Sequence, residues 1–547
     1  MSVRSAGGGA RITLRPSPEA RRYVADGSWS GELVDRALRD GARRHPDRLA
    51  VVDRDRRWDY ATLDRAVDRA AAGLHRLGVG PGEAVSFQLP NWLEAVVVHH
   101  ATLRIGAVSN PIVPIYRERE VGFILRQARS RVLVVPDVFR RFDHRAMAEA
   151  LLPALPDLEH VLVVGEPGPA SRSLDDAFAA DGPPPDVERS SRDPALLLYT
   201  SGTEADPKGV LHSHDTLLHE CRSMIGLYRV DRHDVVLMAS PVTHITGLLY
   251  GMQLPFLVGA PVVLQDTWDV DRALDLIERE RCSFTVGATP FLHGIVHAPS
   301  LDDHDVSSME VFVCGGADVP PALIRAAGER TAMVATRVYG STECPTVTGS
   351  APGAPLAQHA ESDGTAIAPT ELRVVDEDGK PLPAGARGEL QVRGPELCLG
   401  YLDPALNEKA FTADGWFRTG DLAEVDAGGL MRIAGRVKDI IVRGGENLSA
   451  KEIEDLLVEH PDVDEVAVVG APDPVLGERA CAFVVSAAPL RLEDLVAFLR
   501  RRRVANQKLP ERLELVDALP KTASGKVQKH RLRSRLRAAD GEEPTQR

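Results

Sequence analysis

The sequence lacks several features that mark other classes of protein. Only six cysteines occur in 547 residues and no two are spaced as CxxC, so neither a zinc site nor a redox pair is indicated. No run of about 20 apolar residues could span a bilayer, and residues 1–30 hold no apolar run typical of a signal peptide. Scattered thiols without a targeting signal favour a cytoplasmic protein.

Positive charge and lysine are also scarce. A net charge of −14 disfavours binding to nucleic acid or to an anionic membrane surface, since both require a basic face. The chain has nine lysines, the first of them Lys208. The compact lysine ammonium has a mobility that a guanidinium lacks. Each lysine is therefore a candidate functional residue, although ordinary surface positions are expected for most of them.

The hydrophobic pattern of the first half alternates between helix and strand. The expected helices are 63–77 and 92–105, and the expected strands are 83–88, 131–135, 160–164 and 196–199. Such alternation predicts an α/β fold with covered sheets. The stretch 165–193 is rich in Pro, Ser, Asp and Gly, which predicts an exposed connection.

The pattern changes after Glu361. Short strands at 371–376, 388–393, 423–426 and 431–433 are separated by Gly and Asp turns, which predicts a smaller β-rich unit. Helices at 450–459 and 492–502 and strands at 463–469 and 480–485 then predict a compact α+β module. The polar tail after Arg537 is expected to be disordered.

A loop that could bind phosphate follows the expected strand at 196–199. The sequence from Leu196 to Gly209 is LLLYTSGTEADPKG, which supplies backbone N–H groups, hydroxyls and the Lys208 ammonium. It is not a Walker A loop, because the GxxxxGK[ST] spacing is absent. Taken alone, this stretch is equally compatible with an ordinary Ser/Thr/Gly turn.

Four more motifs follow in order: YGSTE at 339–343, GWFRTGD at 415–421, GRVKD at 435–439 and PKTASGK at 520–526. With the loop, they make the chain resemble the acyl-CoA synthetase branch of the adenylate-forming superfamily, from about residue 47 to residue 533. Other branches include luciferases and peptide-synthetase adenylation domains. The segment 90–120 most resembles medium-chain and alicyclic carboxylate CoA ligases.

The resemblance implies a fold and an activity. The fold is α/β, with a large N-terminal domain of two βαβ-type subdomains plus a small β-barrel-like unit, followed by a small mobile α+β C-terminal domain. The expected boundaries are 1–435, a hinge at 436–438 and 439–547. The implied reaction joins a carboxylic acid to coenzyme A through acyl-AMP, with ATP or acyl-AMP, Mg²⁺ and coenzyme A as cofactors.

The resemblance also implies residue roles. Glu343 matches a Mg²⁺ ligand, because a hard cation prefers carboxylate oxygen. Asp421 matches the carboxylate that binds the ribose hydroxyls, and Arg436 an arginine that reaches ribose or phosphate. Lys526 matches the catalytic lysine, whose ammonium would stabilise charge that develops during adenylation. The other expected nucleotide-binding residues are Thr200, Ser201, Gly202, Thr203, Glu204, Lys208, Gly315, Gly316, Ala317, Tyr339, Gly340, Ser341 and Thr342, of which Thr342 is also expected to act in catalysis.

Three further assignments concern motion and the acid. Lys438 matches the hinge about which the C-terminal domain turns, so that Lys526 serves adenylation and the loop Gly444, Gly445, Glu446 and Asn447 serves thiolation by coenzyme A. His244 matches a positioning residue near the acid, and a plain packed histidine is its alternative. Small and apolar residues near His244 and Gly315 suggest a bulky hydrophobic acid, alicyclic or polycyclic.

The chain departs from the family at Glu204 and Ala205, where the family has Thr and Gly. A carboxylate about 4 Å from a phosphate, at an effective dielectric of about 20, is repelled by ~4 kcal/mol. Half of that would slow adenylation roughly thirtyfold. One hypothesis is therefore a weak adenylator that thiolates acyl-AMP supplied by a separate adenylating enzyme. The alternative is an ordinary two-step ligase whose Glu204 faces solvent or pairs with arginine.

The sequence is also compatible with other functions. A stand-alone adenylation enzyme that loads a carrier protein would share nearly every motif, although no carrier domain is fused to the segment. A non-catalytic binding module and a luciferase-like oxygenase are the remaining alternatives. The oligomeric state stays open, and a dimer is one option.

Overall fold

The computed structural model describes residues 18–179, 182–200, 207–316, 319–443, 446–473, 476–502, 504, 506–522 and 525–539. The described residues divide into two compact units. Of these residues, unit 1 holds those in the ranges 18–200, 207–371 and 392–417, and unit 2 holds those in the ranges 372–391 and 418–539. The expected boundary at residue 435 lies inside unit 2, and the hinge at 436–438 stays a prediction.

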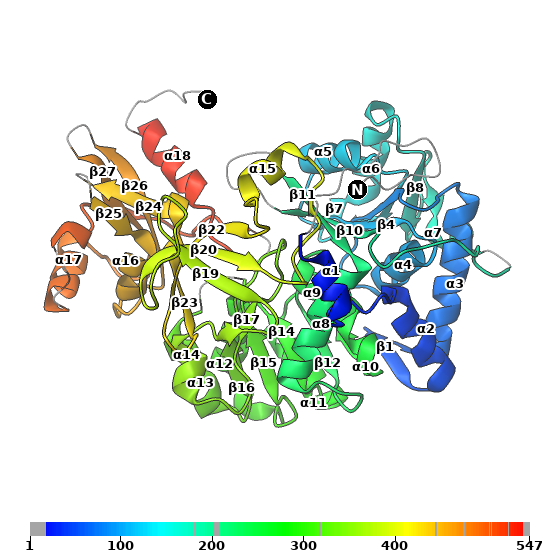
Figure 1. Ribbon diagram of the computed structural model, residues 1–547, viewed down its shortest axis with the longest axis horizontal. Coiled ribbons are helices and arrows are strands. Elements are labelled where there is room, and N and C mark those ends of the chain that lie inside the picture. The colour runs from blue at the N-terminus through cyan, green and yellow to red at the C-terminus, as the bar shows by residue number, and fades with distance from the viewer. Residues whose placement is uncertain are drawn as a thin grey trace. The chain divides into compact units, whose positions relative to one another are not determined.

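Unit 1 is built on two large sheets, as the alternating pattern predicted (Figure 1). The eight-stranded sheet runs in the order β21 (Gly400–Tyr401), β11 (Lys208–Ser213), β10 (Pro194–Thr200), β4 (Val108–Pro111), β3 (Ala84–Phe87), β5 (Val132–Pro136), β8 (His160–Val164), β9 (Arg172–Ser173). The seven-stranded sheet runs in the order β16 (Val334–Arg337), β15 (Val311–Cys314), β14 (Phe284–Gly287), β12 (Val236–Met238), β13 (Val262–Leu264), β1 (Leu49–Asp53), β2 (Arg56–Asp59). Their cores are parallel, for example β14 on β15 with Phe284 opposite Val311.

The helices of unit 1 cover these sheets. They are α1 (Ala20–Ala25), α2 (Val34–Arg44), α3 (Tyr60–Arg76), α4 (Leu93–Arg104), α5 (Glu118–Ala128), α6 (His144–Leu151), α7 (Leu174–Phe178), α8 (His214–Tyr228), α9 (Ile245–Met252), α10 (Leu254–Val258), α11 (Val270–Glu280), α12 (Thr289–His297), α13 (Pro321–Arg330), α14 (Leu356–Glu361) and α15 (Ala405–Ala410). Helix α3 starts where the Asp59 carboxylate accepts from the Thr62 amide at 2.7 Å. Its buried face includes Leu63, Val67 and Leu74, spaced at the helical period.

The predicted exposed connection at 165–193 is partly wrong. Strand β9 and helix α7 lie within it, and β9 pairs with β8 through Leu162 opposite Arg172. Leu174 is buried beneath the polar surface of this stretch. Apolar residues such as Leu174 and Phe178 are few among many polar ones, so the periodic signal is weak and composition alone missed these elements.

Unit 2 begins with short strands. The unit predicted to be barrel-like is a four-stranded sheet in the order β19 (Glu371–Val375), β20 (Arg387–Arg393), β22 (Phe417–Val425), β23 (Met431–Arg436). The short helix η3 (Val437–Asp439) follows. Unit 1 also contains the strand pairs β6 (Val138–Phe139) with β7 (Phe142–Asp143) and β17 (Thr348–Gly349) with β18 (Thr365–Ala366).

The last sheet forms the predicted α+β module. Its strands are β25 (Glu446–Ser449), β24 (Ile440–Arg443), β27 (Gly477–Val485) and β26 (Glu465–Asp473), with β28 (Arg512–Leu515) also paired to β27. Val468 on β26 faces a core with α16 (Ala450–Leu457) and α17 (Leu492–Arg501), whereas Ala467 and Val469 face α18 (Lys529–Ala539). Figure 1 shows α16 and α17 on one side of this sheet and α18 on the other.

The C-terminal helix extends beyond the point where the disordered tail was expected to begin. Helix α18 extends to Ala539, so the boundary of the predicted disordered tail at Arg537 is wrong by two residues, and residues 540–547 lie outside the described part.

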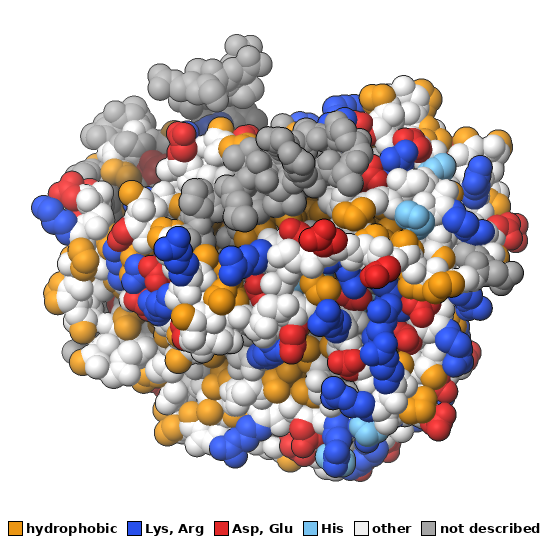
Figure 2. Space-filling view, turned by 45° about the vertical axis from the view of Figure 1, so that its right-hand side comes forward, with side chains coloured by type: hydrophobic (Ala, Val, Ile, Leu, Met, Phe, Trp, Pro, Cys, Tyr) orange, Lys and Arg blue, Asp and Glu red, His pale blue; other side chains and the backbone are white. Residues whose placement is uncertain are grey.

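All six cysteines are buried thiols. In the described part of the chain, no helix has the length and apolar character needed to cross a membrane. Figure 2 shows acidic and basic side chains interspersed over the visible face.

Candidate active site

The predicted phosphate loop connects two paired strands. Strands β10 and β11 run antiparallel and place Thr200 opposite Lys208, the two ends of the loop. The exposed Lys208 ammonium lies 5.7 Å from the centroid of the Tyr401 ring, within range of a cation–π contact. The predicted residues Ser201, Gly202, Thr203 and Glu204, together with Ala205, lie outside the described residues.

Glu343, the predicted metal ligand, is half-buried and fixed at two points. The Tyr401 hydroxyl donates to Glu343 Oε1 at 2.7 Å, and the Cys398 amide donates to the Glu343 carbonyl at 2.8 Å. Burial and the adjacent Glu343 carboxylate raise the pKa of Tyr401, so its hydroxyl stays protonated and acts as the donor. The carboxylate therefore has a defined position on the backbone of unit 1.

His212 ties the next residue to strand β11. Its Nε2 lies 2.8 Å from the Thr342 carbonyl oxygen, and its Nδ1 lies 3.1 Å from Thr216 Oγ1. Burial lowers the pKa of His212 to about 4, so the ring is neutral. A carbonyl oxygen only accepts, so the proton is on Nε2 and Nδ1 is left without one. The motif that carries Thr342 and Glu343 is thereby anchored to the strand that begins at Lys208.

The turn at Gly315 and Gly316, predicted to bind nucleotide, adjoins the Tyr339 motif. Strands β15 and β16 are parallel neighbours, and beyond their ends the Val338 amide donates to the Cys314 carbonyl at 3.0 Å. A Cβ at Gly315 would lie 2.8 Å from Val338 Cγ2, and one at Gly340 would lie 1.5 Å from the Pro345 carbonyl oxygen. Glycine is therefore required at residue 340.

The same turn brings several other predicted residues together. Gly316 adopts a left-handed φ of +78°, as a tight turn requires. The Val347 amide donates to the Tyr339 carbonyl at 3.0 Å, and the Ser341 amide donates to the Cys344 carbonyl at 2.8 Å. Ala317 lies outside the described residues. Gly315, Gly316, Tyr339, Gly340 and Ser341 thus border the ends of parallel strands, where ligands bind in open α/β sheets.

His244 is the residue just before helix α9, and its carbonyl accepts from the Leu248 amide at 2.9 Å. The preceding turn is held by Asn91, whose side-chain amide donates to the Ser240 carbonyl at 2.9 Å while its oxygen accepts from the Val242 amide at 2.8 Å. Asn91 was missed from sequence because it lies far from the turn along the chain. The role of His244 near the acid stays a prediction.

Three predicted residues lie within electrostatic range of one another in unit 2. Asp421 on β22 lies opposite Arg436 on β23, and Arg436 Nε is 2.9 Å from Asp421 Oδ1. Lys526 sits on a turn closed by the Lys526 amide, which donates to Thr522 Oγ1 at 3.1 Å. Burial, reinforced by the positive charge of Arg436, lowers the pKa of Lys526 to about 8, while Asp421 acts in the opposite direction.

The predicted hinge residue Lys438 lies in η3. Its carbonyl accepts from Arg533 at 3.2 Å, and Arg533 also pairs with Asp439 at 2.6 Å. Gly444 and Gly445 of the predicted coenzyme A loop lie outside the described residues. Glu446 and Asn447 lie on β25, and their side chains are not part of the description. The hinge and coenzyme A assignments remain predictions.

Two buried carboxyl groups were not foreseen. The Tyr250 hydroxyl donates to Glu220 Oε1 at 2.5 Å, and the Thr346 amide donates to Glu220 Oε2 at 3.2 Å. Burial raises the pKa of Glu220 to about 8. Burial also raises the pKa of Glu396, which accepts from Thr370 Oγ1 at 2.8 Å, to about 7. Glu220 therefore stays mostly protonated at neutral pH, whereas Glu396 titrates near it.

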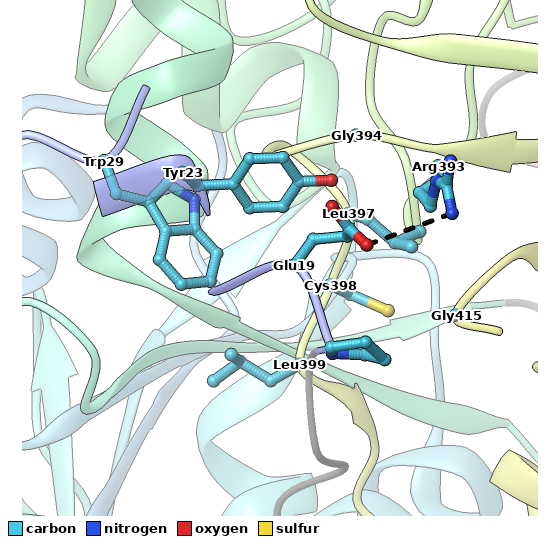
Figure 3. Close-up of a pocket in the computed structure, with 10 residues that line it drawn as sticks. Glu19, Tyr23, Trp29, Arg393, Gly394, Leu397, Cys398, Leu399 and Gly415 are labelled. Carbon is cyan, nitrogen blue, oxygen red and sulfur yellow. Dashed lines mark ion pairs between the residues drawn. The ribbon is translucent and has the colours of Figure 1, made fainter. Parts of the chain in front are cut away.

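Figure 3 shows a small pocket in unit 1 beneath the N-terminal segment. Tyr23 and Trp29 form one wall, and Glu19 pairs with Arg393 at 3.9 Å. Cys398 also lines this pocket, and its amide is the group that donates to the Glu343 carbonyl. None of the residues predicted to bind acid or nucleotide lines it.

Mg²⁺ fits the residues present. In the described part of the chain, no group of three or more His, Cys, Asp or Glu side chains could hold a metal ion by itself. Mg²⁺ bound with a nucleotide needs only one or two carboxylates, because phosphates and water supply the remaining oxygens. The single half-buried Glu343 carboxylate meets that requirement, and the bound ion would neutralise phosphate charge.

Comparison with known proteins decides the family. The model of the AMP-binding enzymes matches residues 38–402, and that of the AMP-binding enzyme C-terminal domain matches residues 452–526. The chain belongs to the AMP-binding enzymes. The resemblance to adenylate-forming ligases and the α/β fold expected from it are therefore confirmed.

Relatives of this AMP-binding enzyme differ in their acceptors. The medium-chain fatty-acid–CoA ligase of Escherichia coli is 38% identical, covering 96% of this chain and 94% of the relative. The salicyl-AMP ligase/salicyl-S-ArCP synthetase of Mycobacterium tuberculosis is 37% identical, covering 97% and 96%. A solved anthranilate CoA ligase in complex with anthranoyl-AMP superimposes with a TM-score of 0.86 at 27% identity, covering 93% and 98%.

Proposed function

We propose that this adenylate-forming ligase makes an acyl-CoA thioester from a hydrophobic carboxylic acid through acyl-AMP. The observation that carries the proposal is the pairing of Asp421 with Arg436, the two residues assigned to the ribose and phosphate, within electrostatic range of the Lys526 cation. The acid–CoA ligases among the similar proteins support coenzyme A as the acceptor. The six buried thiols suit a reducing cytoplasm.

The residues would divide the work of the first half-reaction. Asp421 and Arg436 bind the ribose and α-phosphate, and Lys208 and the loop before it hold the outer phosphates. Mg²⁺ at Glu343 supplies positive charge to the polyphosphate when it is bound. The Lys526 ammonium stabilises the negative charge that builds up as the carboxylate attacks the α-phosphorus and pyrophosphate leaves. A turn at Lys438 then removes Lys526 and admits coenzyme A, whose thiolate attacks the acyl carbonyl and expels AMP.

The bulky hydrophobic acid remains a proposal about the substrate. Two of the similar proteins act on aromatic acids by name, salicylate and anthranilate, and another on medium-chain fatty acids. A panel of octanoate, benzoate, salicylate, cyclohexanecarboxylate and naphthoate, assayed with ATP and coenzyme A, separates these classes. Thioester from none of these acids, with ATP or with the matching acyl adenylates, would refute the proposal.

We further propose that Glu204 and Ala205 weaken the first half-reaction, leaving the chain dependent on acyl-AMP from a separate adenylating enzyme. The double change Glu204→Thr with Ala205→Gly should then raise acid-dependent pyrophosphate release about thirtyfold. Glu204→Gln alone isolates the charge, and Ala205→Gly alone isolates backbone freedom. Fast pyrophosphate release by the unchanged protein, with no gain in the variants, identifies an ordinary two-step ligase.

Transfer to a carrier protein is the second candidate. The mycobacterial relative, whose name specifies loading of an aryl carrier protein, favours it. Competition between free coenzyme A and a phosphopantetheinylated aryl carrier protein, with salicyl-AMP as the donor, distinguishes the two acceptors. Acylation of the carrier alone would replace coenzyme A as the proposed acceptor.

A further inference from the structure

Tyr401 joins the two charged residues assigned to the outer phosphates and the metal. Its hydroxyl donates to Glu343 Oε1 at 2.7 Å, and the Lys208 ammonium lies 5.7 Å from its ring centroid. All three residues belong to unit 1, Lys208 and Glu343 in the stretch 207–371 and Tyr401 in the stretch 392–417. Tyr401 is nearly inaccessible to solvent, at 5% exposure.

Strand pairing fixes the position of Tyr401. It lies on β21, which pairs with β11 so that Tyr401 is opposite Val210. The Leu402 amide, next along the chain, donates to the Gly209 carbonyl at 2.8 Å. The Tyr401 amide in turn donates to Asn407 Oδ1 at 2.8 Å. A displacement of Tyr401 would therefore disturb the backbone directly after Lys208.

The hydrogen bond selects one oxygen of the Glu343 carboxylate. Among the described residues, the only side-chain hydrogen bond to this carboxylate comes from Tyr401 and reaches Oε1. A carboxylate can accept at both oxygens, so Oε2 keeps its lone pairs for a cation. A hydroxyl–carboxylate hydrogen bond is charge-assisted and restricts the torsion of the glutamate.

We infer that Tyr401 is a positioning residue for the metal–nucleotide complex: it orients Glu343 so that one oxygen faces Mg²⁺, and its ring confines the Lys208 ammonium. Tyr401 itself touches neither metal nor phosphate in this assignment. The inference rests on the proposed role of Glu343, and it adds a residue that determines how strongly the metal is held with the nucleotide.

The test measures metal binding and needs no acid substrate. Mn²⁺, a paramagnetic substitute for Mg²⁺, is titrated into the full chain with saturating ATP, and bound ion is followed by electron paramagnetic resonance. Tyr401→Phe keeps the ring and removes the hydroxyl. The expected result is a rise of about tenfold or more in the dissociation constant of Mn²⁺, since hydrogen bonds to charged groups are the strong ones.

Tyr60→Phe is the matched control. The Tyr60 hydroxyl is fully buried and donates to the Ala260 carbonyl at 2.9 Å, so its loss also removes one buried hydrogen bond. Both variants should lose similar thermal stability, but only Tyr401→Phe should weaken Mn²⁺ binding. Glu343→Gln should weaken it further, and Tyr401→Phe should add little in that background, because the two residues act as a unit.

Three outcomes would overturn the inference. They are equal Mn²⁺ affinity in Tyr401→Phe and the unchanged protein, equal loss in Tyr60→Phe, and no ATP-dependent Mn²⁺ binding by the unchanged protein. Formation of acyl-CoA is measured separately, so a failed thioester assay with intact Mn²⁺ binding counts against the proposed function and not against the role of Tyr401.

Discussion

Raising the pH should slow adenylation before it slows thioester formation from acyl-AMP. Burial and Arg436 lower the pKa of Lys526 to about 8, so this side chain loses its charge as the pH rises through that value. At pH 9 roughly a tenth of the free enzyme keeps the ammonium, which predicts a tenfold fall in kcat/KM for ATP relative to pH 7. Thiolation does not use Lys526 in the proposed mechanism and should keep its rate over this range.

The assay follows acid-dependent pyrophosphate release from pH 6 to 9.5, beside thioester formation from synthetic acyl-AMP and coenzyme A. Lys526→Arg keeps a positive charge at every pH used, so its lower rate should show no alkaline decline. Arg436→Gln removes the positive charge that lowers this pKa most and should move the decline to higher pH. A flat profile for adenylation, or an unchanged decline in Lys526→Arg, would refute the assignment of Lys526.

The remaining predictions concern stability and nucleotide binding. The raised pKa of Glu220 contributes stability below its unfolded value, near 4.5, and that stability is lost as the pH rises through about 8. Glu220→Gln should therefore unfold at higher urea than the unchanged protein at pH 9, with a gain in unfolding free energy on the order of 3 kcal/mol. No such gain is expected at pH 4.5. The fully buried Asp35 has its Oδ2 3.8 Å from Arg104 Nε. Arg104→Met leaves Asp35 with one cation fewer and should lower the free energy of unfolding, measured in urea, by about 3 kcal/mol. No loss of stability would contradict this prediction. Asp421→Asn should weaken ATP binding in calorimetry by roughly tenfold or more, and unchanged affinity would remove Asp421 from the ribose site.

The large elements were predictable because their patterns are local. The buried strand expected at 160–164 is β8, and the buried helix expected at 92–105 is α4, which differs by one residue at each end. Every residue of α4 except Glu94 is buried, and the apolar run in its sequence therefore predicted the helix clearly. Strand β9 and helix α7 were missed because they are too short to show a period.

The candidate site was predictable only where a motif holds its residues together in the sequence. Lys208, Glu343 and Asp421 each lie in such a motif, and resemblance supplied their roles. Tyr401 contacts Glu343 across 58 residues of chain, through the pairing of β21 with β11, and nothing in its own sequence surroundings predicts that contact. The buried state of Glu220 likewise arises from the packing of α8 and α9, which residue spacing does not define.

The most direct test of the account is the formation of thioester by the purified chain from synthetic acyl-AMP and coenzyme A, followed by mass spectrometry. The probes are octanoyl-AMP, salicyl-AMP and anthranoyl-AMP, chosen for the acids named among the similar proteins. We expect release of AMP and formation of the matching acyl-CoA from at least one of these acyl adenylates, whether or not ATP supports the first half-reaction. The proposal would be contradicted if acyl-AMP stayed intact with coenzyme A. That holds whether a carrier protein is acylated in its place or neither thiol is acylated.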